Sequence, residues 1–188
     1  MKRLFIAIDL PLEIKKELYK IEEDLMKYIP RGVKWVEMEN FHFTIRFLGE
    51  TEENEIPNII KIMDEVAKES DSFYISLKEI GAFPNFKNPR VIWIGIEKGY
   101  KEMKDLFNKL ETRISKLKFK KEDKDFSPHL TLGRIKEKIR WDEKWKINIP
   151  YLEFFVEEIA LFESQLTSQG PIYITLYKCK LVKNQKKS

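Results

Sequence analysis

The chain contains few residues of the kinds that bind metals or form disulfides. Its 188 residues include one cysteine, Cys179, and two histidines, His42 and His129. A lone cysteine cannot form an internal disulfide, which favours a reducing, cytoplasmic setting. Zinc sites use three or four Cys, His or carboxylate ligands, and the sequence has no HExxH or CxxC motif. We therefore expect no metal and no other cofactor.

Long hydrophobic runs and glycine-rich phosphate loops are also absent. Asp9 and Pro11 interrupt the apolar stretch near the N-terminus. No later stretch approaches the roughly 18 apolar residues of a spanning helix, so we expect neither a signal peptide nor a membrane partner. GxGxxG and GK[ST] patterns are missing, which gives no indication of a dinucleotide or P-loop site.

The composition is that of a compact domain. Hydrophobic residues make up 43% and aromatic residues 13% of the chain, enough for a core. The net charge is only +4, and the abundant lysine and glutamate are typical of thermophile proteins. We expect a single monomeric domain over residues 1–188, with a frayed tail at 183–188.

Hydrophobic periodicity predicts an α+β fold. Helices are expected at 12–28, 56–68 and 101–117. Strands are expected at 3–10, 33–37, 41–48, 73–83, 91–97, 129–135, 152–162 and 171–182.

The chain also matches itself at an offset of 87 residues. The strand that begins at Arg3 then falls on the strand that begins at Arg90, and the helices that follow coincide. At the same offset His42-Phe-Thr-Ile falls on His129-Leu-Thr-Leu. A duplicated strand-helix-strand unit predicts two pseudo-symmetric lobes of mainly antiparallel sheet, with helices on the outer faces and an active site in the cleft between them.

Both histidines occur in the pattern His-apolar-Thr-apolar, which is a rare coincidence in a chain with six threonines. Side chains alternate along a strand, so each histidine shares a face with the threonine two residues on. In the first motif this alternation places Arg46 on the face of His42 and Thr44, and Phe47 on the core face. In the second motif His129 and Thr131 share a face.

Two such pairs suit displacement at phosphorus. One neutral imidazole can accept a proton while a second, protonated imidazole donates one. The threonine hydroxyls can hydrogen-bond to phosphate oxygens. A single His-x-Thr on a sheet is more often an ordinary cross-strand pair, but here the duplicated motif uses every histidine of the chain. Cys179 lies in an alternating strand and is expected in the core.

With these motifs the chain resembles the 2H phosphoesterase superfamily, and in particular the RNA 2′,3′-cyclic phosphodiesterases, formerly called 2′-5′ RNA ligases. The resemblance covers nearly the whole chain. Its main segments are RLFIAIDLP at 3–11, HFTIRFLGE at 42–50, GAFP at 81–84, PRVIW at 89–93, FSPHLTLGR at 126–134 and LFES at 161–164.

The resemblance implies metal-free hydrolysis of RNA 2′,3′-cyclic phosphate ends to 2′-phosphates, with weak reverse ligation as a side activity. It implies that His42 is the proton donor and His129 the proton acceptor. The residues alone indicate that one histidine is an acid and the other a base, but not which histidine has which role. Thr44 and Thr131 are expected to bind the phosphate. The alternatives are a relative acting on ADP-ribose cyclic phosphate or 2′-5′ oligonucleotides, and a non-catalytic RNA-end-binding module.

Two arginines are further candidates for substrate binding. Strand alternation places Arg46 on the side of the sheet that would face the phosphate. The alternative is that Arg46 is a strand residue exposed to solvent. Arg134 is at a family motif position, yet alternation from His129 puts it on the other face unless a bulge follows Gly133. Other side chains have two interpretations each. Base stacking or simple packing is open for Trp35, Phe83 and Phe86, and RNA contact or a solvated loop is open for residues 118–125.

Overall fold

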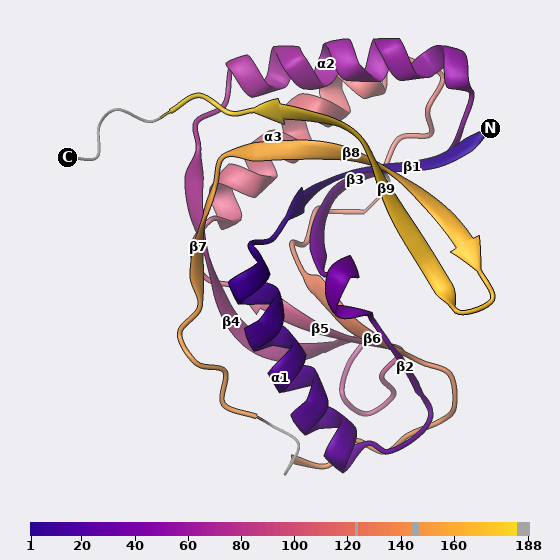
Figure 1. Cartoon of the computed structure of the whole chain (residues 1–188), viewed down its shortest axis with the longest axis vertical. Coiled ribbons are helices and arrows are strands. Elements are labelled where there is room, and N and C mark those ends of the chain that lie inside the picture. The colour runs from indigo at the N-terminus through magenta and orange to yellow at the C-terminus, as the bar shows by residue number, and fades with distance from the viewer. Residues whose placement is uncertain (123, 144–146, 184–188) are drawn as a thin grey trace.

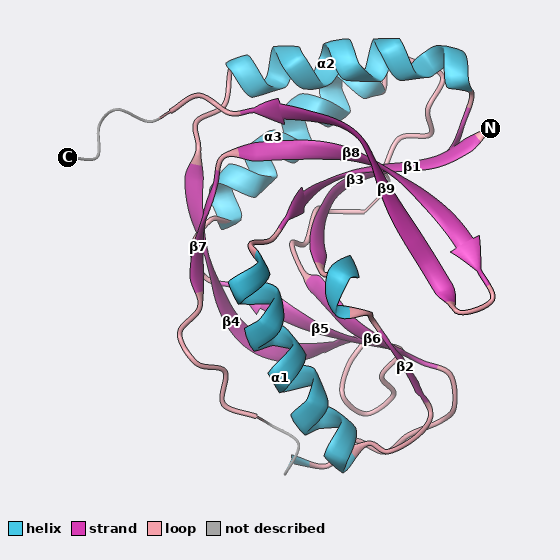
Figure 2. Cartoon of the chain, in the orientation of Figure 1, coloured by secondary structure: helices cyan, strands magenta, loops and turns pink. Residues whose placement is uncertain are grey.

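The computed structural model describes residues 1–122, 124–143 and 147–183. They form two antiparallel sheets, each of which combines strands from early and late parts of the chain (Figures 1 and 2). The first sheet has the order β3-β1-β8-β9, and the second β2-β6-β5-β4-β7. This is the α+β architecture that the sequence predicts.

The strands of the first sheet come from both ends of the chain: β1 (Lys2–Asp9), β3 (His42–Thr51), β8 (Glu158–Thr167) and β9 (Gly170–Lys180). The second sheet holds β2 (Val33–Trp35), β4 (Phe73–Phe83), β5 (Val91–Ile96), β6 (Leu130–Ile135) and β7 (Glu153–Val156). The prediction of one strand over residues 152–162 is wrong, because Glu157 separates β7 in one sheet from β8 in the other. The chain therefore crosses between lobes at that residue.

Helices α2 (Ile56–Lys68) and α3 (Tyr100–Ile114) pack on the first sheet (Figure 2). The Tyr177 hydroxyl of β9 donates a hydrogen bond to Asp64 of α2 at 2.6 Å. Helix α1 (Leu12–Tyr28) buries one face, formed by Ile14, Leu18, Ile21 and Leu25. This spacing of three or four residues is that of an amphipathic helix. The predicted third helix is shorter than expected, and Leu117 lies beyond its end.

One continuous hydrophobic core is shared by both sheets and all three of these helices. Short 3-10 helices η1 (Met38–Asn40) and η2 (Glu53–Glu55) precede β3 and α2. A smaller apolar cluster of Phe5, Ala7, Ala160 and Phe162 is separate from the main core. Among the described residues, no helix is long and apolar enough to cross a membrane. Most of the frayed tail expected at 183–188 lies outside the described residues.

Candidate active site

His42 begins β3 and is paired across the sheet with Asp9 at the end of β1. Its Nδ1 lies 2.7 Å from the backbone oxygen of Asn40, and its Nε2 lies 2.8 Å from the Thr44 hydroxyl. A carbonyl oxygen can only accept, so Nδ1 carries a hydrogen and the neutral ring keeps its lone pair on Nε2. The predicted shared face of His42 and Thr44 is confirmed by this contact.

His129 immediately precedes β6 and is held in the same way. Its Nδ1 lies 2.7 Å from the backbone oxygen of Ser127, again two residues upstream. The same tautomer is therefore fixed in both motifs, and Nε2 is the atom that can exchange a proton in each. Both imidazoles are half-buried.

Thr44 and Thr131 occupy equivalent places in the two sheets. Thr44 pairs with Ala7 of β1, and Thr131 pairs with Trp93 of β5. The offset between repeats is thus 87 residues for the motif strands, as predicted, but 86 residues between Ala7 and Trp93. The predicted alignment of β1 with β5 at an offset of 87 residues is therefore wrong by one position. The reason is that Ala7 precedes Thr44 by one residue fewer than Trp93 precedes Thr131.

Aromatic rings surround both imidazoles. The Phe5 ring lies 5.0 Å from His42, and Tyr173 of β9 meets His42 edge-on at 5.2 Å. In the other lobe Phe83 meets His129 edge-on at 5.0 Å. Phe83 thus packs against a motif histidine and against Trp93, a position that the sequence, with base stacking or simple packing open for Phe83, does not predict. Phe5 and Tyr173 are missed by sequence analysis, because they reach the site through the pairing of β1 with β3 and of β9 with β8.

Burial lowers the pKa of both histidines below the usual value for imidazole. Charges nearby differ between the two. The carboxylate of Asp9 raises the pKa of His42, whereas Lys15 and His129 lower it. The guanidinium of Arg134 lowers the pKa of His129. The two motif histidines are therefore close enough to interact. His42 has both the negative charge of Asp9 and the positive charge of Lys15 beside it, whereas the charge beside His129 is positive.

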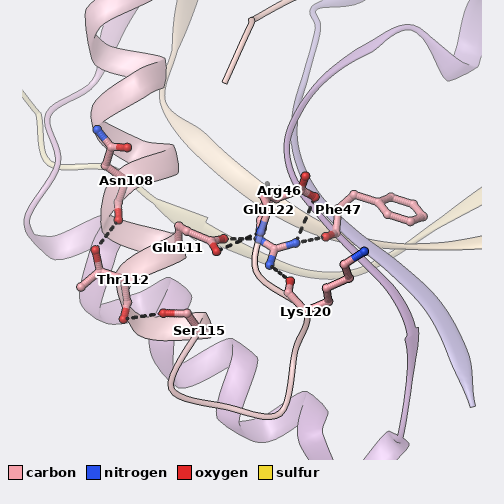
Figure 3. A network of polar contacts seen from close by, with 8 residues as sticks. All are labelled: Arg46, Phe47, Asn108, Glu111, Thr112, Ser115, Lys120 and Glu122. Atoms are coloured by element: carbon pink, nitrogen blue, oxygen red, sulfur yellow. Dashed lines mark hydrogen bonds and ion pairs between the residues drawn. The ribbon is translucent and has the colours of Figure 1, made fainter. Parts of the chain in front are cut away.

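Arg46 does not share the face of His42, so the predicted orientation is wrong. β3 bulges at Ile45, where Thr44 pairs with Ala7 and Arg46 pairs with the next residue of β1, Ile6. A bulge adds one residue and reverses the alternation that follows. Arg46 is only 3% exposed and forms an ion pair with Glu111 of α3 (Figure 3). It also donates hydrogen bonds to Glu122 at 3.2 Å and to the Lys120 carbonyl at 2.6 Å.

The same bulge also reverses the direction of the next side chain, that of Phe47. Phe47, predicted in the core, is 40% exposed, and the guanidinium of Arg3 lies 5.2 Å from its ring centre. Arg46 therefore anchors the loop that precedes the second motif and is not placed to bind phosphate. Its two contacts also hold the Lys120–Glu122 part of the 118–125 segment against β3.

Arg134 reaches the site through a bulge in β6. The extra residue is Leu132, one position before the predicted place, because Thr131 pairs with Trp93 and Gly133 with Ile92. Arg134 is exposed, and its charge lowers the pKa of His129 and counteracts the effect of burial on Tyr173. A bulge thus places Arg134 near the motif residues. From the sequence, such a bulge is the condition for Arg134 to bind the phosphate.

The two remaining aromatic candidates pack within the second lobe. Trp35 lies against the backbone of Gly133, where an added Cβ would come within 3.0 Å of its ring. Phe86 packs on Trp141 with ring centres 4.7 Å apart. Both contacts agree with the packing interpretation.

Cys179 is buried, as predicted, and burial raises the pKa of its thiol to about 12. A thiol in that state is a poor nucleophile. Within the part of the chain that the structure describes, no three His, Cys, Asp or Glu side chains form a metal-ligating group.

A cavity of about 530 Å³ opens beside His42. It lies between the end of β1, the turn around η1 and the β8–β9 hairpin. Aromatic residues Phe5, Phe162 and Tyr173 line it together with His42, as do the carboxylates of Asp9, Glu37 and Glu39. The motif histidine thus stands at the edge of a space large enough for a small organic group.

Two sheets that each contribute a His-x-Thr strand to one site define a 2H-type phosphoesterase. The profile of the family described as LigT-like phosphoesterases matches residues 8–93 and again residues 94–173. The chain therefore belongs to this family.

Related proteins agree with this assignment. An RNA 2′,3′-cyclic phosphodiesterase of Methanocaldococcus jannaschii is 39% identical, over 91% of this chain and 96% of that protein. One of Thermotoga maritima is 38% identical over 94% of each chain. The crystal structure of TT0787 of Thermus thermophilus superposes with a TM-score of 0.81 at 32% identity, covering 95% of this chain and 97% of that one.

Proposed function

We propose that this protein hydrolyses 2′,3′-cyclic phosphates at the ends of RNA and leaves a 2′-phosphate. The observation that carries the proposal is the pair of imidazoles with equivalent backbone anchors, each leaving Nε2 for proton exchange. The similar RNA 2′,3′-cyclic phosphodiesterases, which align over more than nine-tenths of both chains, support the choice of substrate.

In the proposed reaction His129 takes a proton from water, which attacks phosphorus. The bond from phosphorus to the ribose 3′ oxygen breaks, and His42 gives its Nε2 proton to that oxygen. The charges around each ring support this assignment. Of the charges near His42, Asp9 has the largest effect and favours the protonated form, against Lys15 and His129, whereas Arg134 favours the neutral form of His129. An acid needs the first state and a base needs the second.

The hydroxyls of Thr44 and Thr131 complete the site in this proposal. Thr44 contacts the Nε2 of His42, so a phosphate oxygen that reaches this nitrogen also reaches the hydroxyl. Hydroxyl and guanidinium donors, the latter from Arg134, stabilise the charge that develops on the non-bridging oxygens. Reversal of the same proton transfers joins a 5′-hydroxyl to the cyclic phosphate, which we propose as a weak side reaction.

The test is an assay of a short RNA that ends in a 2′,3′-cyclic phosphate, with phosphorus NMR to identify the product. The same RNA with a 3′-phosphate is the negative control. ADP-ribose 1″,2″-cyclic phosphate and a 2′-5′ oligonucleotide test the competing substrates. A fixed acid and a fixed base allow one leaving oxygen, so we expect the 2′-phosphate alone. A mixture of 2′- and 3′-phosphates contradicts the mechanism.

The histidine variants form the second part of that test. His42→Ala and His129→Ala are each expected to lose about 10²–10⁴-fold in kcat, the usual contribution of a general acid or base. Both side chains lie outside the main core, so circular dichroism should show an unchanged fold. An RNA-end-binding module without turnover would instead bind the substrate and release no product.

A further inference from the structure

The segment that leads into the second motif has no regular secondary structure of its own. Helix α3 ends at Ile114 and β6 begins at Leu130, and residues 119–122 and 124–129 are in neither helix nor strand. The regular backbone hydrogen bonds of a helix or a sheet therefore do not fix these residues. Their position depends on tertiary contacts with the rest of the molecule.

Arg46 holds the first part of this segment, although it belongs to the strand of the other motif. Its Nη2 donates to the Lys120 carbonyl at 2.6 Å and its Nη1 to the Glu122 carboxylate at 3.2 Å, while its Nε pairs with Glu111 of α3. The other carboxylate oxygen of Glu111 accepts from the Glu122 amide at 3.2 Å. Figure 3 shows the guanidinium between α3 and this segment. Arg46 and Glu111 thus clamp the segment at Lys120 and at Glu122.

The end of the segment carries the partner of the motif histidine. Phe126 stacks on Phe107 of α3, with ring centres 4.9 Å apart and planes 8° apart. The next residue, Ser127, supplies the carbonyl that lies 2.7 Å from Nδ1 of His129. The hydrogen bond at one ring nitrogen decides which nitrogen carries the proton. The ring of His129 therefore depends on where the segment places Ser127.

The clamp uses the particular shape of arginine. A guanidinium presents five N–H donors in a planar fork, whereas an ammonium presents three donors at a single point. Arg46 uses a different nitrogen for each of Glu111, Glu122 and the Lys120 carbonyl, and it is only 3% exposed. A lysine at this position keeps a positive charge for Glu111 but cannot serve all three partners. Arg46→Lys therefore separates the loop contacts from the buried charge.

We propose that Arg46 is a positioning residue for His129. By fixing the segment before Ser127, it keeps the Nδ1 hydrogen of His129 on the Ser127 carbonyl and leaves Nε2 to accept a proton. A residue of the first motif strand thus determines the state of the histidine in the second motif. The effect on turnover rests on the proposed function, in which His129 is the base, whereas the effect on the ring does not.

Histidine-selective ¹⁵N labelling tests the state of the ring directly, because the chain has only two histidines. His42→Ala assigns the remaining signals to His129. At about pH 8 both rings are neutral, since burial lowers both pKa values below the usual one for imidazole. In the wild type we expect Nδ1 to carry the hydrogen in both rings. In Arg46→Lys we expect a mixture of the two tautomers at His129 and no change at His42.

Steady-state kinetics of the same variant measure the consequence. We expect the kcat of Arg46→Lys to fall about 10- to 100-fold, the scale of a misplaced catalytic group, with little change in KM. The matched control is Arg113→Lys. Arg113 of α3 donates to both carboxylate oxygens of Glu69 at 2.7 Å and so ties α3 to the end of α2. The same chemical change there should alter neither ring and leave kcat unchanged.

The outcomes separate this inference from the proposed function. Unchanged His129 signals in folded Arg46→Lys, or an equal change at His42, would overturn the positioning role. If Arg46→Lys does not fold, Glu122→Ala decides, because it removes one contact of Arg46 from a side chain that is 37% exposed. It should change His129 in the same direction but less, and no change would overturn the role.

Activity is judged separately from the ring. A wild type with the expected tautomers that does not cleave a cyclic phosphate would contradict the proposed function and leave the positioning of His129 intact. A tautomer mixture at His129 of Arg46→Lys without a loss of kcat would overturn the contribution of Arg46 to catalysis.

Discussion

Ile45 and Leu132 are the extra residues of two equivalent β-bulges. Ile45 follows Thr44 of the first motif, and Leu132 follows Thr131 of the second, at the same offset of 87 residues. Each bulge places two consecutive side chains on the buried face and turns the next one toward the site. Arg134 faces the site for this reason, and so does its equivalent Phe47.

The buried position after each bulge is used differently in the two lobes. It holds Arg46 in the first lobe and Gly133 in the second. A Cβ at Gly133 would lie 2.7 Å from Val33 and 3.0 Å from Trp35, so no larger side chain fits there. At Arg46 the neighbour is α3, whose Glu111 supplies a counter-charge. Close packing therefore requires glycine at this position in the second lobe, whereas in the first lobe a charge is accommodated there by an ion pair with a helix.

The buried ion pair gives a stability prediction. Arg46→Met leaves the buried carboxylate of Glu111 without its counter-charge, with the hydrogen bond from the Glu122 amide remaining, and loss of one partner of a buried ion pair typically costs about 3–5 kcal/mol. We expect the free energy of unfolding, measured in urea, to fall by that amount. Arg46→Met/Glu111→Gln should recover part of it, because no charge then remains buried.

The matched control is Lys20→Met, which removes a cation from an exposed i,i+3 pair with Glu17. Exposed pairs contribute about 1 kcal/mol or less. Equal effects of Lys20→Met and Arg46→Met would show that the Arg46 pair does not stabilise the fold.

Much of the site could be predicted because period-2 alternation is local. It places Thr44 beside His42 correctly, and duplication points to the second motif. Alternation fails at Arg46, since a bulge depends on how β1 pairs with β3 and leaves no composition signal at Ile45. Phe5 and Tyr173 are missed for the same reason: they reach His42 only through strand pairing over long separations in sequence. The division of residues 152–162 between two sheets likewise depends on tertiary structure and not on the local sequence pattern.

Glu22 of α1 gives a second stability prediction. Its side chain is 1% exposed, and its Oε2 has no hydrogen-bond partner in the described structure. Burial, helped by the nearby charge of Glu37, raises the pKa of Glu22 to about 8. The folded protein then keeps this carboxyl protonated while the unfolded chain ionises it above its usual pKa of 4.5. Stability is therefore lost as the pH rises between these two values.

Glu22→Gln removes that pH-dependent cost. We expect the variant and the wild type to differ by a constant offset below pH 4.5, and the variant to gain a few kcal/mol on the wild type by pH 8, since one pKa unit corresponds to about 1.4 kcal/mol. Urea unfolding at pH 4.5, 6 and 8 measures the difference. A difference that is independent of pH would show that Glu22 titrates normally.

Chelation should leave the activity unchanged. Two imidazoles can perform both proton transfers at the phosphorus without a Lewis acid. We expect the same kcat before and after prolonged dialysis against EDTA, with a known zinc hydrolase as the positive control for metal removal. Loss of activity that Zn²⁺ or Mn²⁺ restores would contradict the two-histidine mechanism.

The last prediction concerns pH and the different charges beside the two histidines. The reaction needs one protonated and one neutral imidazole, so kcat/KM should be bell-shaped, with two macroscopic pKa values that belong to the pair. Burial lowers both pKa values, so we expect the optimum on the acid side of 6.5, the usual pKa of histidine. A profile that is flat from about pH 5 to 9 would show that neither histidine transfers a proton.

Single variants then identify which histidine holds the proton at the optimum. Asp9→Asn removes the charge that raises the pKa of His42, while Lys15 and His129, which lower it, remain. If His42 is the protonated partner, the alkaline limb must move to lower pH. Arg134→Gln removes the charge that lowers the pKa of His129, so the acid limb must move to higher pH. Asp105→Asn, an exposed carboxylate on α3, is the control and should move neither limb. A shift of the acid limb in Asp9→Asn would mean that His42 is the neutral partner, which reverses the proton states from which we assign His42 as acid and His129 as base.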